Sequence, residues 1–73
     1  HLTDALFNIN KAISIKPDYS KAFLTRANIL KELKHFDKAF KNYDKAIELK
    51  NDNAEAYCNR GNLLLELKRF EEA

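Results

Sequence analysis

The chain has 73 residues, of which 45% are hydrophobic and 33% are charged, and its formal net charge is +2. This composition excludes a disordered polymer, and no apolar run is long enough to span a bilayer. The 13 basic and 11 acidic residues alternate along the chain, so neither nucleic acid nor a membrane is an expected partner. A single cysteine, Cys58, excludes an intrachain disulfide and favours a reducing, cytoplasmic compartment.

The spacing of apolar residues, three or four positions apart, predicts helices along most of the chain. The first spans Leu2–Ile15 and stops at Lys16-Pro17, because proline disfavours helical geometry in the residue before it. The second is expected over about residues 20–34, with Asp18 as its N-cap. The third follows a short turn and spans Phe36–Leu49.

A fourth helix is expected over residues 54–68, where Asp52 and Glu55 resemble a capping box, and residues 69–73 would open a fifth. Gly61 costs about 1 kcal/mol in a helix interior, which predicts that another helix approaches it closely. The expected buried stripes are Ala22, Phe23, Ala27, Leu30 and Leu33 in the second helix, Phe36, Ala39, Phe40, Tyr43, Ala46 and Ile47 in the third, and Ala56, Tyr57, Gly61, Leu64 and Leu67 in the fourth.

The chain repeats itself with a period of 34 residues. Of the 39 residue pairs that lie 34 positions apart, 17 are identical. Periods of about 20–50 residues are typical of solenoids and arrays. The period divides the chain into the second half of one unit (1–19), a complete unit (20–53), and the first half of a third unit with the start of its second half (54–73). We therefore expect an all-α fold whose two ends expose apolar surface.

The residues at equivalent positions resemble the tetratricopeptide repeat family, whose unit is a pair of antiparallel helices, A and B. The motif falls on Phe23, Tyr57, Ala27, Gly61, Leu30 and Leu64 in helix A, and on Ala5, Ala39, Ala73, Tyr43, Ala12, Ala46 and Pro17 through helix B. The resemblance implies helix-turn-helix units stacked as a right-handed α-solenoid. Arg26 and Arg60 stand where the family usually has Leu, and we favour a structural role for them over ligand binding, since arginine can bury its stem and keep its head solvated.

In the family that this chain resembles, the A helices line a concave groove that holds a peptide or protein segment. The resemblance therefore implies a protein–protein interaction module that binds its partner on the side of helix A that faces away from helix B. The residues expected there are Lys21, Leu24, Thr25, Asn28, Lys31 and Glu32 in the second helix, and Glu55, Cys58, Asn59, Asn62, Leu65 and Glu66 in the fourth.

Asn28 and Asn62 occupy the same place in successive units. Asparagine is a poor helix former, and its amide both donates and accepts hydrogen bonds. The pair predicts a ladder that grips a peptide backbone, and the alternative is hydrogen bonding between helices that stabilises stacking. The family's carboxylate clamp combines this asparagine with a lysine one turn earlier, where Leu24 and Cys58 stand, so the clamp is not expected.

Nothing in the pattern of residues indicates an enzyme, a cofactor or a metal site. His1 and His35 fall at equivalent turn positions, and Cys58 has no nearby histidine in the sequence. Metal-ligand spacing and phosphate-binding glycines are absent from the sequence. A second hypothesis for function is a structural spacer or a self-assembling repeat array joined through its exposed ends, with any catalytic domain lying outside these residues.

Overall fold

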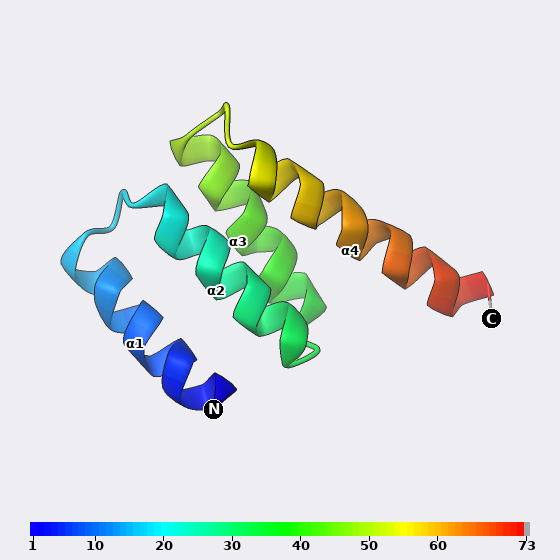
Figure 1. Cartoon of the computed structure of the whole chain (residues 1–73), viewed down its shortest axis with the longest axis horizontal. Helices are drawn as coiled ribbons and strands as arrows, with labels where there is room; N and C mark the ends of the chain where they lie inside the picture. Colours follow the sequence, from blue (N-terminus) through cyan, green and yellow to red (C-terminus); the bar gives the residue numbers. More distant parts are fainter. Residues whose placement is uncertain (73) are drawn as a thin grey trace.

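The computed structural model describes the backbone of residues 1–72 and the side chains of residues 1–69. Within that range the chain forms four α-helices and no strand: α1 (Leu2–Ile15), α2 (Ser20–Glu32), α3 (Phe36–Leu49) and α4 (Ala54–Glu72) (Figure 1). The predicted all-α class is confirmed. Ala73, which the sequence assigns to the repeat motif, lies outside the described residues. None of the helices described is both long and apolar enough to cross a membrane.

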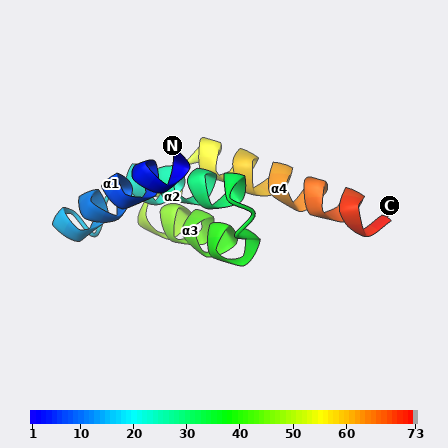
Figure 2. The ribbon, with the colours of Figure 1, turned by 90° about the horizontal axis from the view of Figure 1, so that it is seen from below.

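Helix α2 is the centre of the molecule and contacts each of the other three helices. Consecutive helices run antiparallel, with α1 and α4 at opposite edges (Figure 1). Helix α3 lies in a second layer against α2 (Figure 2). The molecule is accordingly a slab of 42 × 30 × 15 Å. Because α2 and α3 together form the complete unit, this unit supplies most of the core and the half-units flank it.

The core combines small residues with a few large ones, as the repeat pattern predicts. Ala27, Ala39 and Ala46 are fully buried, and so is the large side chain of Tyr43. Alanine at a helix crossing allows the two axes to approach to about 8–10 Å, and Tyr43 fills the space beside the alanines. Phe23, Ala27 and Leu30 of the predicted α2 stripe lie in one core cluster with the predicted α3 stripe, whereas Ala22 and Leu33 are not part of that cluster.

A left-handed residue ends α2 two positions earlier than expected. Lys34 has φ of 68°, the only positive φ among the described residues. The His35 N–H donates to the Leu30 carbonyl at 2.8 Å, and the Lys34 N–H donates to the Lys31 carbonyl at 3.0 Å. This pair of bonds is a Schellman motif, which satisfies the last carbonyls of a helix and reverses the chain within two residues. Helix α3 can therefore begin at once and pack back on α2.

Both predicted aspartate caps are wrong by one residue. The N-cap of α2 is Tyr19, which makes no side-chain capping bond, and Asp18 lies in the turn before it. At the start of α4 the Asn53 Oδ1 accepts the Ala56 N–H at 3.1 Å, so Asn53 caps the helix in place of Asp52. Asparagine satisfies an otherwise unpaired helix N–H as well as aspartate does.

The buried side of α4 differs from the predicted stripe. Ala56 is buried as expected, but Leu63 is fully buried, while Tyr57 and Leu64 are 54% and 47% exposed. Tyr57 and Leu64 correspond to the side of α2 that α3 covers, and no described segment covers it in α4. The expected close contact at Gly61 is also wrong, because a Cβ atom there would meet nothing within 4 Å. Apolar side chains of α4 are therefore exposed, as expected for this end of the described chain.

Helix α4 continues without a break through residues 69–72, where the sequence predicts the start of a new helix. In the complete unit, the break at Lys34 is followed by a helix whose apolar stripe packs on α2. Most helical stability in proteins comes from such packing. No such packed helix is described after Lys68, and the backbone of residues 69–72 continues α4.

Candidate functional site

An open hollow with a volume of about 470 Å³ lies against α2 and is bordered by α1 and α4. Its lining residues are Leu2, Thr25, Asn28, Ile29, Lys31, Glu32 and Asn59. None of them belongs to α3, which packs on another side of α2. Five of the lining residues are among those that the sequence predicts for partner binding, namely Thr25, Asn28, Lys31, Glu32 and Asn59. We call this hollow the α2–α4 groove.

The other predicted site residues are distributed along the same two helices. Lys21, Leu24 and Glu55 line a smaller hollow where α2 and α4 begin. Leu24 is itself mostly in the core. Glu66 joins Lys31 and Glu32 around a third hollow at the other end of α2. The remaining predicted residues, Cys58, Asn62 and Leu65, are exposed on α4.

Two residues of the groove were missed by the sequence analysis, Leu2 and Ile29. Ile29 is buried and forms part of the apolar floor. The signal for it lay in the repeat: Ile29 and Leu63 are equivalent, and each follows a buried alanine, Ala22 or Ala56, by seven residues. A spacing of seven places two residues on one face of a helix. That second stripe marks where one unit packs on the next.

Asn28 joins three helices at the groove. Its Oδ1 accepts a hydrogen bond from the Tyr43 hydroxyl on α3 and another, of 3.3 Å, from Asn59 Nδ2 on α4. The carbonyl end of the Asn28 amide therefore has the second of the two roles that the sequence left open, hydrogen bonding between helices. An asparagine amide also carries two N–H donors. Asn28 Nδ2 makes no hydrogen bond to any described residue, so it can donate to a ligand.

The surroundings of the Tyr43 phenol disfavour its ionisation. Its ring is fully buried, and burial raises the pKa of its phenol above the ordinary value of 10.0. The negative charge of Glu66 raises the pKa further, because a second anion nearby disfavours the phenolate. The hydroxyl therefore remains a donor to Asn28 throughout the physiological pH range.

We expect the free energy of unfolding to fall as the pH rises above 10.0, the ordinary pKa of tyrosine. The unfolded chain releases the Tyr43 proton at a lower pH than the folded chain, so alkaline pH favours unfolding, and the effect fades as the pH falls below 10.0. Denaturant titrations of the wild type and Tyr43→Phe between about pH 8 and pH 11 measure it. The stability advantage of the wild type should shrink with rising pH, and a constant advantage would contradict the assignment.

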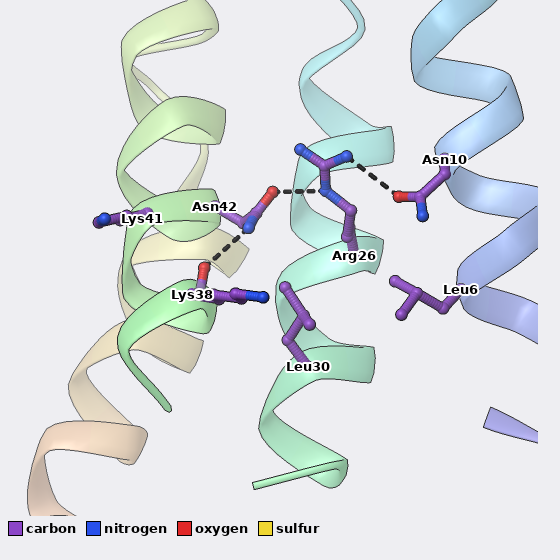
Figure 3. Close-up of a pocket in the computed structure, with 7 residues that line it drawn as sticks. All are labelled: Leu6, Asn10, Arg26, Leu30, Lys38, Lys41 and Asn42. Carbon is purple, nitrogen blue, oxygen red and sulfur yellow. Dashed lines mark hydrogen bonds between the residues drawn. The ribbon is translucent and has the colours of Figure 1, made fainter. Parts of the chain in front are cut away.

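A further hollow, of about 270 Å³, lies on another side of α2, between α1 and α3. Figure 3 shows the Arg26 guanidinium between Asn42 of α3 and Asn10 of α1. Arg26 Nε donates to Asn42 Oδ1 at 2.7 Å, and its Nη1 donates to Asn10 Oδ1 at 3.1 Å. Asn42 in turn donates to the Lys38 carbonyl at 2.7 Å. Burial lowers the pKa of the Arg26 guanidinium below its ordinary value, because desolvation disfavours the charged form.

The next unit repeats this arrangement. Arg60 Nε donates to Asp44 Oδ1 at 2.7 Å, and Asp44 is the residue 34 positions after Asn10. Each guanidinium also lies near an aromatic ring, Arg26 at 5.1 Å from the centre of Phe23 and Arg60 at 5.7 Å from that of Phe40. Both arginines therefore tie a helix A to the helix B of the preceding unit. The structural role favoured from the sequence is confirmed.

The fold and these repeated contacts define a helical-repeat protein whose units are pairs of antiparallel helices. The family model described as TPR repeat matches residues 27–68, more than half of the chain. The chain belongs to the tetratricopeptide repeat family, as the residue pattern indicated. Proteins of this family are generally protein–protein interaction modules and typically non-catalytic. Among curated proteins, no match to the chain is found.

Proposed function

We propose that the α2–α4 groove binds an extended peptide or protein segment through its backbone. The observation that carries this proposal is the free Nδ2 of Asn28, which borders the groove while its Oδ1 is held by Tyr43 and Asn59. A side chain fixed at one end presents its other end in a defined direction, which reduces the entropy lost when a ligand binds. The exposed Asn62 occupies the equivalent place one unit further along α4.

The groove is lined by both apolar and charged side chains, which fits a ligand that carries both kinds of group. Ile29 and Leu2 supply apolar surface, and Lys31 and Glu32 supply one charge of each sign. The Thr25 hydroxyl already donates to the Lys21 carbonyl at 3.0 Å, so it can only accept a further bond. Such a surface offers no concentrated charge for an acidic tail. It suits main-chain amides and carbonyls, with moderate selection among side chains.

The substitution Asn28→Asp tests the proposal because it removes the donor end of the amide and keeps an acceptor, while it adds one negative charge. An aspartate still accepts from Tyr43 and Asn59, so the fold should keep its stability. A phage-displayed library of random peptides serves as the probe, and the most enriched peptide is then titrated against each variant. Together with Asn62→Ala, this substitution should weaken peptide binding about tenfold or more, which is the effect of losing one or two hydrogen bonds.

The matched control is Asn51→Asp, which makes the same change of charge at an exposed position of the α3–α4 turn. It should leave peptide binding unchanged. Equal affinity of wild type and the Asn28→Asp, Asn62→Ala variant would overturn the proposal, and so would a library selection that enriches no peptide for the wild type.

The alternative of a structural spacer is favoured by one observation, the use of the Asn28 carbonyl to join α2 to α3 and α4. Replacing Asn28 and Asn62 together by Ala separates the two functions. Loss of the helical circular dichroism signal would show that the two asparagines stabilise the packing of the helices. Loss of peptide binding with unchanged helicity would show that they serve the groove.

A further inference from the structure

The hollow between α1 and α3 carries positive charge without a balancing acid. We call it the Arg26 hollow, and it shares no lining residue with the α2–α4 groove. Arg26, Lys38 and Lys41 line it, and none of the described residues that line it is acidic. All three basic residues come from α2 and α3, which together form the complete unit. The charge of the hollow therefore belongs to the middle of the molecule and not to an edge of the slab.

The Arg26 guanidinium is held in place while part of its donor capacity stays unused. Of the five N–H donors of a guanidinium, Arg26 uses one on Asn42 and one on Asn10, so three have no acceptor among the described residues. Asn42 is itself buried and donates to the Lys38 carbonyl. A guanidinium fixed in this way loses little freedom when it binds a further acceptor, and a carboxylate matches its planar donors.

The next unit shows which group an arginine at this position binds. Asp44 is the residue 34 positions after Asn10, and its Oδ1 accepts a hydrogen bond from Arg60 Nε at 2.7 Å. The chain thus supplies a carboxylate to Arg60, whereas both hydrogen bonds of the Arg26 side chain go to neutral amides. The Arg60–Asp44 pair is therefore an intramolecular example of the contact that Arg26 lacks.

The other lining residues add charge and apolar surface. Figure 3 shows the Lys38 side chain extending from α3 toward Leu30 of α2, while the Lys41 side chain extends the other way. Neither lysine has an ion-pair partner among the described residues. Leu6 and Leu30 supply apolar surface beside these charges. At about 270 Å³ the hollow is smaller than most small-molecule pockets, which measure about 300–1,000 Å³, so a side chain of a larger partner fits it better than a whole metabolite.

We propose that the Arg26 hollow binds an acidic side chain, glutamate or aspartate, of a protein partner. The carboxylate would accept hydrogen bonds from the unused N–H groups of Arg26 and lie near the Lys38 ammonium, and its methylene groups would pack on Leu30. Charge complementarity selects a segment rich in acidic residues. This contact lies on another side of α2 from the groove, and it does not depend on the function proposed for the groove.

The probe for this proposal is hexaglutamate, titrated into the isotopically labelled 73-residue chain. Proton–nitrogen NMR spectra follow the Nε–H signal of Arg26 and the backbone amide signal of Lys38. Both signals should shift in a saturable way with hexaglutamate and stay in place with hexaglutamine. Inorganic phosphate and oligothymidylate are titrated in parallel. Tighter binding of either of these two than of hexaglutamate would overturn the assignment to an acidic protein segment.

Asn10→Asp is the decisive substitution, because it gives Arg26 the carboxylate that Arg60 already has. Asn10 Oδ1 accepts from Arg26 Nη1 at 3.1 Å, and aspartate has nearly the same shape as asparagine, so the new carboxylate should pair with the guanidinium. We expect the affinity for hexaglutamate to fall about fivefold or more. The matched control is Asn8→Asp, which makes the same change of charge at an exposed position of α1 that does not line the hollow.

The control should change the affinity by less than about twofold, because an exposed charge outside the site is screened by solvent. Lys38→Gln removes a charge from the hollow at an exposed position and should also weaken binding, which provides a second test should Asn10→Asp lose helicity. Its control is Lys11→Gln, an exposed position outside the hollow. An Arg26 signal that hexaglutamate does not shift, or equal losses of affinity in a variant and its control, would overturn the proposal.

Discussion

Replacing Tyr43 with Ala should lower the free energy of unfolding by about 3–5 kcal/mol, the range seen when a large buried ring is removed from a core. Tyr43 is one of the two largest fully buried side chains, and its hydroxyl joins α3 to Asn28 of α2. A domain of this size is stable by only about 4–11 kcal/mol. The Tyr43→Ala protein should therefore lose a large share of its stability. Urea denaturation followed by circular dichroism measures the change.

The control for this prediction is Tyr43→Phe, which keeps the ring and removes the hydroxyl. It should cost about 1 kcal/mol, the net value of one hydrogen bond. If the Ala and Phe variants lost the same stability, the ring would not be the main contribution and the helix crossing at Tyr43 would have to be looser than it is in this structure.

Replacing Ala27 with Leu should destabilise the chain by about 1–3 kcal/mol, because the α2–α3 crossing has no space for a larger side chain. Ala27 is fully buried among the residues that join these two helices. The same substitution at the equivalent position, Gly61→Leu, meets open space and also removes a glycine from a helix interior. It should be neutral or stabilising by up to about 1 kcal/mol.

Thermal unfolding of the two variants measures the difference. Equal destabilisation at both positions would mean that the uncovered side of α4 is in fact occupied.

The sequence predicted the helices well because their limits have local causes. Pro17 ends the first helix region, and the 34-residue period places the others. The caps were displaced by one residue, because Asp52 and Asn53 are both good capping residues and only the geometry of the turn decides between them. The sequence placed the end of α2 two residues too late, because lysine is not a residue type that favours the left-handed conformation adopted by Lys34.

The limits of sequence reasoning are clearest at α4. Two residues that lie 34 positions apart have the same surroundings only where the same neighbouring helix is present in both units. Tyr57 and Leu64 have the chemistry of Phe23 and Leu30, but the helix that buries the latter pair has no described counterpart beside α4. Leu63 is buried instead because its neighbour is the preceding unit.

The groove could be predicted in outline from the family resemblance, and its internal bonding could not. Asn28, Asn59 and Thr25 were expected on one surface, and the structure brings them together around one hollow. The partners of Asn28 Oδ1 depend on how far α3 and α4 are rotated about their own axes. A rotation of a few tens of degrees would exchange a bond between helices for an exposed amide without altering the periodicity of either helix.

The Asn53 side chain has a mechanical consequence for any longer assembly. Besides capping α4, its Nδ2 donates to Ser20 Oγ at 3.2 Å, and this hydroxyl donates to the Ala46 carbonyl at 2.7 Å. One chain of bonds thus fastens the start of α4 to the complete unit. The residue that replaces Ser20 in the following unit is Ala54, which has no hydroxyl. A further unit stacked after α4 would accordingly lack this fastening, and a stack of such units would bend more readily there than between the complete unit and α4.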